Sequence, residues 1–314
     1  MEQNVNKISL PETVRYIKLG SGGNWEQECL TKGIIRMGFG TESGERFLLC
    51  QNGDWPGLNA SFIAEGKERG TAARFTKELR LFFEDPGTML WITFMNECLC
   101  WGHVDGSPAQ LHADGDGVWR TIAGGWRNTD VNGELLIKEK LSGALTKLAA
   151  YRGTSCDVDV ASYVIRRING EKMPEVERTS AALHELQSTI PALMQMLTPG
   201  DFELLVELIF STSGWRRESV TGGTQDTKDI GLWLPSTDER AFVQVKSRTT
   251  PKELATYIEK FRERSDSYKR MFYVYHTGSL SSPNDPRVTL IGPEQLARLV
   301  VDAGLVNWLI DKTS

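Results

Sequence analysis

An acidic residue and a lysine lie on neighbouring predicted strands in the C-terminal part of the chain. The segments 229–234 and 241–246 are rich in apolar residues and are separated by a short turn sequence, which predicts a β-hairpin. Side chains at i and i+2 of a strand share a face, so Gln244 and Lys246 are expected together. A lysine buried in a sheet needs a charged partner, and Asp229 on the other strand can supply one. Such a group could hydrolyse phosphodiesters, because the acid would hold a divalent metal and the lysine would support the attacking water or neutralise phosphate charge.

A helix is predicted just before this hairpin. It starts at Pro199 with Asp201 as its N-cap, and Gly214 lies at its end. Its buried stripe is predicted from apolar residues at helical spacing, which are Phe202, Leu205, Val206 and Ile209. Glu203 and Glu207 lie four residues apart on one flank of this stripe. A solvated acidic flank is the ordinary explanation, but the hairpin favours a role at the metal for Glu203. The sequence leaves open which of the two acids serves it.

These elements resemble the Mrr branch of the PD-(D/E)XK restriction-endonuclease-like nucleases. The resemblance rests on short segments in matching order, at 197–199, 202–206, 213–215, 228–230 and 244–247. It implies an active site around Mg²⁺ or Mn²⁺ that consists of Glu203, Asp229, Gln244 and Lys246, with Asp229, Glu203 and Val245 as metal ligands. Gln in place of a second acid leaves fewer negative ligands, so weaker metal affinity is expected. The chain departs from the family at Gly231, where many relatives carry a second Asp.

The rest of the C-terminal part alternates between helix and strand patterns. Thr250 is the predicted cap of a helix at 251–264. Buried strands are expected at 271–275 and 287–291, and a last helix at 293–303. This alternation indicates an α/β domain with a mixed sheet covered on both faces, in agreement with the restriction-endonuclease-like fold that the resemblance implies.

The length of 314 residues predicts more than one domain, because a single hydrophobic core rarely serves so long a chain. A polar, proline-containing stretch near residue 175 is typical of a connector. We therefore expect a substrate-recognition domain at 1–175, a linker helix at 176–198 and a nuclease domain at 199–314. No segment approaches the roughly 20 apolar residues that cross a bilayer, so we expect a cytoplasmic protein that has no membrane partner.

Two other patterns could suggest metal sites. The five cysteines are scattered and odd in number, which argues against a disulfide scaffold. Cys98, Cys100 and His103 lack the paired spacing of zinc sites, so buried thiols in a strand are expected instead. The run 112–117 looks like a calcium loop but has no Glu at the required place, so a surface turn is expected there.

The first 175 residues contain mainly short strand and turn patterns, and they hold six of the nine tryptophans. The segments 85–94 and 100–104 loosely resemble part of a PUA-like barrel of the EVE or YTH kind, so a mainly β domain is expected. In such modules aromatic side chains surround a flipped, modified base, and the resemblance implies a cage drawn from four residues, Trp25, Trp55, Trp101 and Trp126. The competing explanation is that these tryptophans fill a core.

Charge neither requires nor excludes nucleic-acid binding. The chain holds 36 Lys and Arg against 41 Asp and Glu, so DNA binding would depend on local patches. Arg248 and Lys252 are the candidate contacts to the DNA backbone. Further candidates are Arg216, Arg217, Lys246 and the run Lys260, Arg262, Arg264, Lys269 and Arg270. A solvated helix face explains that run equally well.

These features predict a metal-dependent DNA endonuclease, specifically a modification-dependent restriction or phage-defence enzyme. Its N-terminal half would select the substrate and its C-terminal half would cut. Cutting both strands needs two active sites, so a homodimer or larger homo-oligomer is expected. Two alternatives remain: an effector nuclease activated by a small signal or a partner protein through its N-terminal half, and a non-catalytic reader of modified DNA. The sequence does not decide which modification or signal is read, which DNA sequence is recognised, or whether RNA is cleaved.

Overall fold

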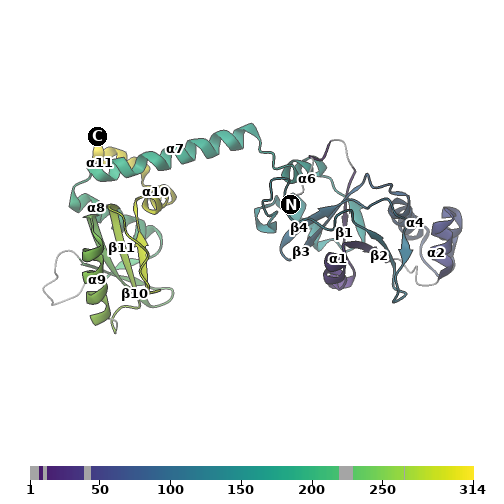
Figure 1. Cartoon of the computed structure of the whole chain (residues 1–314), viewed down its shortest axis with the longest axis horizontal. Coiled ribbons are helices and arrows are strands. Elements are labelled where there is room, and N and C mark those ends of the chain that lie inside the picture. Colours follow the sequence, from purple (N-terminus) through teal and green to yellow (C-terminus); the bar gives the residue numbers. More distant parts are fainter. Residues whose placement is uncertain (1–6, 10–12, 39–43, 219–228, 265) are drawn as a thin grey trace. The chain divides into compact units, whose positions relative to one another are not determined.

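The chain folds into two compact units, Met1–Met173 (unit 1) and Pro174–Ser314 (unit 2). The structure is a computed structural model that describes residues 7–9, 13–38, 44–218, 229–264 and 266–314, and Figure 1 shows the course of the chain. Both units combine helices with β-sheets, so the fold class is α/β. Within the described ranges, no helix has both the length and the apolar content to cross a bilayer.

A mixed five-stranded sheet organises the described part of unit 2, in the order β12-β11-β10-β9-β8. Its strands are β8 (Arg216–Arg217), β9 (Asp229–Leu234), β10 (Glu239–Arg248), β11 (Arg270–Thr277) and β12 (Val288–Ile291). β10 pairs antiparallel with β9 and parallel with β11, and β11 pairs parallel with β12. The predicted hairpin is therefore confirmed as β9 and β10, and the mixed character of the sheet is confirmed as well.

Helices cover both faces of this sheet. They are α7 (Pro174–Met196), α8 (Pro199–Thr212), α9 (Pro251–Glu263), α10 (Pro293–Asp302) and α11 (Val306–Thr313). Val243 and Val245 of β10 belong to the core formed with α7, α8, α10 and α11, whereas Phe242 belongs to the core formed with α9. Alternate residues of β10 thus face opposite helical layers, as the period of a strand requires.

Two helix starts in unit 2, those of α8 and α9, have side-chain caps, and one of them corrects the prediction. Thr250 caps α9 as predicted, in a complete capping box with Glu253. At α8 the predicted cap was wrong: the N-cap is Thr198, whose hydroxyl accepts a hydrogen bond from the amide of Asp201. Pro199 occupies the first turn of α8, so the cap must precede it. The C-terminal helix α11 was not predicted.

A buried histidine joins β11 to the start of α8. The ring of His276 stands edge-on to Phe202, with the ring centroids 4.6 Å apart. His276 Nδ1 lies 2.9 Å from Thr277 Oγ1, and His276 Nε2 has no hydrogen-bond partner among the described residues. Burial, followed by the positive charge of Arg248, lowers the pKa of His276. This contact places the N-terminal end of α8 at the level of the C-terminal ends of β10 and β11.

Unit 1 contains two sheets in its described residues. The first sheet has the strand order β4 (Cys98–Gly102), β3 (Leu90–Met95), β1 (Val14–Ile17) and β7 (Ser155–Asp157). The second sheet has the strand order β2 (Ile34–Met37), β6 (Val118–Thr121) and β5 (Gln110–Leu111). Its α-helices are α1 (Glu26–Lys32), α2 (Gly44–Gln51), α3 (Trp55–Ala64), α4 (Arg69–Glu84), α5 (Gly143–Thr146) and α6 (Ala161–Ile168). Short 3₁₀ turns lie at Ser21–Gly23, Lys138–Lys140 and Lys147–Ala150.

The prediction of a mainly β N-terminal domain was therefore wrong, and among the described residues no single PUA-like barrel closes. The helices α2, α3 and α4 occupy most of residues 44–84. Gly57 and Gly70 lie in the first turns of α3 and α4, so these glycines do not mark turns between strands.

We expect unit 2 to lose stability as the pH falls, in part through His276. Because its pKa is lowered in the folded state, the folded protein binds the proton less readily than the unfolded chain, whose histidine pKa is near 6.5. This contribution to stability is present above that pH and is lost below it. The variant His276→Asn removes the titration. Unfolding midpoints of both proteins, measured from about pH 7.5 to about pH 5, should converge as the pH falls. A constant difference between them would contradict this assignment.

Candidate active site

The register of the β9–β10 hairpin sets the geometry of the candidate site. Asp229 is the first residue of β9 and is paired directly with Gln244 of β10. Directly paired residues of antiparallel strands lie on the same face of a sheet. Position 229 therefore shares a face with Gln244 and, two residues on, with Lys246. The side chain of Asp229 lies outside the described part of the structure.

Lys246 lies on the face that α9 covers. Its ammonium nitrogen is 4.9 Å from the ring centroid of Tyr257, and the ammonium of Lys260 is 4.8 Å from the same centroid. Tyr257 therefore contacts two cations, whose attraction to an aromatic ring restricts where they can lie. Lys246 is half-buried, so its charge lies at the border between the sheet and solvent. Tyr257 itself packs against the core on the α9 side of the sheet.

Gln244 lies two residues before Lys246 on the same face of β10 and is fully buried. Its Nε2 donates to the backbone carbonyl oxygen of Val245, with the two atoms 3.2 Å apart. A carbonyl oxygen has two acceptor sites, so this bond still leaves Val245 able to bind a cation. The side chain of Val245 packs in the opposite core, so only its backbone can serve the site.

The two acids of α8 differ in their partners. Glu207 accepts a hydrogen bond from Arg217 of β8 at 2.9 Å, which turns this flank of α8 toward the β8–β9 edge of the sheet. Glu203 precedes it by one helical turn on the same flank and is half-buried. Among the described residues, no ion pair or hydrogen bond engages the Glu203 carboxylate. Of the two acids, Glu203 is thus the one that can bind another cation.

Glu203 nevertheless belongs to a helix that covers the face of the sheet opposite to Gln244 and Lys246. α8 packs against Val243 and Val245, whereas Gln244 and Lys246 face α9. Within the described residues, β10 has a neighbour on its β9 side only as far as Gln244. Beyond the Asp229–Gln244 pair, the described strands leave this edge of β10 unpaired. Glu203 lies at this level of the strands because its neighbour Phe202 contacts His276.

The oxygen atoms of these groups are of the chemical type that binds a hard divalent cation. Mg²⁺ and Mn²⁺ prefer oxygen ligands, and the site offers the Glu203 carboxylate, the Val245 carbonyl and an aspartate at position 229. The uncompensated, half-buried charge of Glu203 favours a cation there. Among the described side chains, no group of three His, Cys, Asp or Glu residues stands ready to hold a metal. Any metal would therefore depend on backbone oxygen and water as well.

The predicted DNA-contacting cations divide into two groups. Arg217, Arg262 and Arg270 are engaged by carboxylates, the last at 2.7 Å from Glu239. Arg248 and Lys252 are exposed, and no ion pair holds either of them within the described ranges. They follow Lys246 along β10 and the start of α9, so they remain the candidate contacts to a nucleic-acid backbone.

Each of the four tryptophans of the predicted cage has partners in the structure, and three of them, Trp25, Trp55 and Trp126, belong to or pack against one core. Trp101 and Trp126 are buried in two different cores, and their indole N–H groups donate to backbone carbonyls of Thr129 and Ile34. Trp55 donates to Glu84 and packs on Phe83. Trp25 lies under the guanidinium of Arg36, 4.2 Å from its carbon. The core explanation accounts for these side chains, because each one already has partners within unit 1.

The other predicted features of unit 1 are structural. Cys98 and Cys100 lie in β4 and are buried, as expected. Residues 112–117 form a surface turn, which Arg36 holds through hydrogen bonds to the carboxylate of Asp114 and the backbone oxygen of Asp116. Arg36 is 1 % exposed, so these bonds compensate a buried charge.

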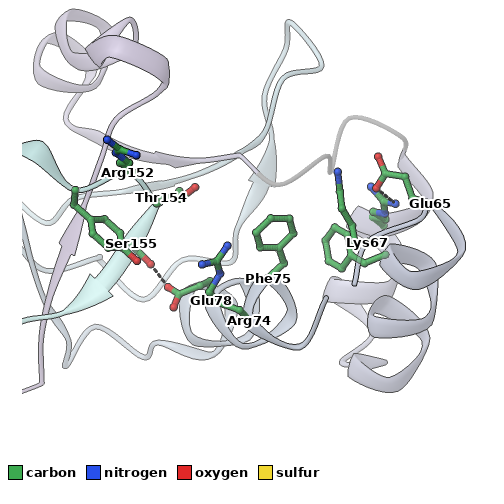
Figure 2. A pocket seen from close by; sticks show the side chains of 12 residues that line it. Glu65, Lys67, Arg74, Phe75, Glu78, Arg152, Thr154 and Ser155 are labelled. Atoms are coloured by element: carbon green, nitrogen blue, oxygen red, sulfur yellow. Dashed lines mark hydrogen bonds and ion pairs between the residues drawn. The ribbon is translucent and has the colours of Figure 1, made fainter. Parts of the chain in front are cut away.

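Sequence reasoning missed one candidate site in unit 1, a cavity lined by several cations and aromatic rings. Its residues come from α2, α3, α4 and the segment before β7 (Figure 2). They are far apart in the sequence and form no run, so only the folded chain gathers them. Two further cavities of unit 1 adjoin the strands β1 and β3. None of these three cavities is lined by a tryptophan of the predicted cage.

Comparison of the chain with protein-family models, with curated proteins and with solved structures found no match in any of the three.

Proposed function

We propose that the protein is a metal-dependent DNA endonuclease of the Mrr-like, PD-(D/E)XK kind, with its active site in unit 2. The observation that supports this proposal most directly is the hairpin register, which assigns Asp229, Gln244 and Lys246 to one face of the sheet. The α/β sheet with helices on both faces is compatible with such a nuclease fold.

The proposed roles follow from the chemistry of each group. Asp229, Glu203 and the backbone of Val245 would hold Mg²⁺ or Mn²⁺, which supplies Lewis acidity to the phosphate when it is bound. Lys246, restrained against Tyr257, would orient the attacking water and offset the negative charge that develops on the phosphate. Gln244, fixed inside the sheet, would position the Val245 carbonyl to which it donates.

The purified protein is expected to nick or cut DNA only when Mg²⁺ or Mn²⁺ is present. Asp229→Ala and Lys246→Ala should each lower the rate by at least about a hundredfold, because each removes a group that acts on the reacting phosphate. Conversion of supercoiled plasmid, both methylated and unmethylated, measures the rate. Undiminished cutting by both variants would refute the proposed site.

The two acids of α8 provide a matched comparison. Glu203→Gln is expected to raise the Mg²⁺ concentration needed for half-maximal cutting, because it removes a negative ligand, whereas Glu207→Gln should leave that concentration nearly unchanged. Both variants remove one charge from the same flank of one helix. If Glu207→Gln proved the more damaging, the assignment of the helix ligand would be reversed.

DNA binding is expected to depend on the cations beside Lys246. The double variant Arg248→Glu with Lys252→Glu should weaken binding and reduce the slope of log affinity against log salt by about 2, since about one phosphate contact is lost per residue. Arg298→Glu is a control on α10, on the other side of the sheet. Fluorescence anisotropy over a range of salt concentrations measures both slopes, and equal slopes for the double variant and the wild type would remove these residues from the DNA interface.

A homodimer is part of the same proposal, because cutting both strands requires two sites. α7 extends beyond the rest of unit 2 (Figure 1), and Val176, Leu183 and Leu186 on its first half are 50 %, 44 % and 36 % exposed. Val176 and Leu183 lie seven residues apart, and the same spacing continues to the buried Ile190. A seven-residue apolar repeat pairs best with a helix of the same repeat, so a second copy of α7 is the partner that fits.

The dimer is tested by two double variants of α7. Leu183→Glu with Leu186→Glu places charge on the exposed apolar positions and should yield monomers, whereas Ala181→Glu with Ser188→Glu, on the other side of the helix, should not. Sedimentation velocity distinguishes the species. A monomeric wild type, or equal effects of the two double variants, would exclude this interface.

Unit 1 would select the substrate, and two mechanisms are possible. The first candidate is recognition of a modified base, but the four tryptophans that were predicted to hold the base line none of the three cavities described for unit 1. The second candidate is an effector nuclease that senses a small signal, and the cation-lined cavity of unit 1 favours it. Cutting of unmodified DNA only after addition of an effector would support the second candidate, and dependence on base modification alone would support the first.

A further inference from the structure

A cavity of about 360 Å³ lies in unit 1 among α2, α3, α4 and the segment that leads into β7. Figure 2 shows Phe75 between Glu78 and Lys67, with Arg152, Thr154 and Ser155 on the strand side. Small-molecule sites commonly measure about 300–1,000 Å³, so this cavity is large enough for a small organic ligand and much larger than one inorganic ion needs.

The charges around the cavity favour an anion. Four cations line it, Arg46, Lys67, Arg74 and Arg152, against the two carboxylates Glu65 and Glu78. Glu65 is already engaged by Arg46 at 2.8 Å. Lys67, Arg74 and Arg152 are exposed, and no carboxylate pairs with any of them among the described residues. Residues 1–173 hold 20 Lys and Arg against 22 Asp and Glu, so this local excess of positive charge is not a general property of unit 1.

The second carboxylate of the cavity lining, that of Glu78, is buried. Glu78 is 8 % exposed, and it accepts hydrogen bonds from Arg15 of β1 and from the hydroxyl of Ser155. Arg15 is itself 1 % exposed and also donates to Asp157. The charge of Glu78 is therefore compensated by Arg15, so it does not neutralise the positive charges of Lys67, Arg74 and Arg152. This network also ties α4 to β1 and β7, which gives the cavity a rigid base.

Aromatic rings complete the lining. Phe75 and Phe62 meet edge to face with centroids 5.4 Å apart, and Tyr151 lies on the other wall. Phe75 is half-buried, and the guanidinium carbon of Arg74 lies 5.5 Å from its ring centroid. A flat apolar surface beside guanidinium groups that no described carboxylate engages suits a molecule that combines a planar ring with a phosphate. The hydroxyl and backbone groups of Thr154 and Gly153 add hydrogen-bonding partners for the edge of such a ring.

We propose that this cavity binds a nucleotide, with its phosphate held by Arg74, Arg152 and Lys67 and its base against Phe75. The same chemistry is offered by a free nucleotide that acts as a signal and by a single nucleotide turned out of a nucleic-acid strand. The site lies wholly within unit 1, so its binding can be tested without any reference to the nuclease activity proposed for unit 2.

Equilibrium binding by isothermal titration calorimetry tests the proposal on the full chain. The probes are AMP, GMP, CMP and UMP, their triphosphates, inorganic phosphate, and short single- and double-stranded DNA. Saturable binding of a free nucleotide would identify a soluble ligand, and binding of DNA alone would identify a nucleotide within a strand. If no nucleotide in either form bound, or if inorganic phosphate bound as tightly as every nucleotide, the proposal would be overturned.

Variants locate the binding in the cavity. Arg74→Gln with Arg152→Gln should weaken nucleotide binding by at least about tenfold, because two charge-assisted contacts to phosphate are lost. The matched control is Lys77→Gln with Arg80→Gln, which removes two positive charges from α4 outside the cavity and should bind as the wild type does. Equal losses in the two double variants would show a general charge effect and would contradict the assignment.

The base contact has its own readout. Phe75→Leu keeps an apolar side chain but removes the ring, so nucleotide affinity should fall by about fivefold or more while binding of inorganic phosphate stays the same. Thermal unfolding of each variant confirms that unit 1 remains folded. Unchanged nucleotide affinity in a folded Phe75→Leu protein would rule out the proposed base position.

Discussion

The candidate active site depends on the register between β9 and β10. A shift of one residue would move Lys246 and Gln244 to the face of α8 and turn Val243 and Val245 away from the core that they now fill. The turn helps to hold this register, since Asp238 adopts a left-handed conformation with φ of 53° and its carboxylate accepts a hydrogen bond from the indole of Trp233. The bond spans the turn and secures the first paired residues of the hairpin. The placement of position 229 opposite Gln244 follows from that pairing.

The elements of unit 2 were largely predictable because local chemistry specifies them. Alternating apolar residues and a polar turn predicted the hairpin, and Thr250 before a proline predicted the start of α9. The position of the α8 cap was missed by three residues, since both Thr198 and Asp201 are good caps and only the proline between them decides. The engagement of Glu207 by Arg217 could not be predicted, because it depends on how α8 lies against the edge of a sheet.

Unit 1 shows the limits of the same reasoning. A tryptophan suits a core and a base-binding cage equally well, so sequence alone could not separate the two for Trp101 and Trp126. The structure separates them through burial and through the hydrogen bonds of the indole groups. The cavity beside α4 was invisible in the sequence for another reason. Its cations lie at positions as distant as Arg46 and Arg152, and only the packing of α4 on the first sheet makes them neighbours.

The cysteines of unit 1 have a practical consequence. Burial raises the pKa values of Cys29, Cys50 and Cys100 to about 12 and that of Cys156 to about 11, so at neutral pH these four thiols are almost entirely protonated. Maleimides and similar labels react with the thiolate form, and these groups therefore react slowly. The fifth cysteine, Cys98, is buried, so a cysteine introduced at an exposed position would be labelled in preference to the natural thiols.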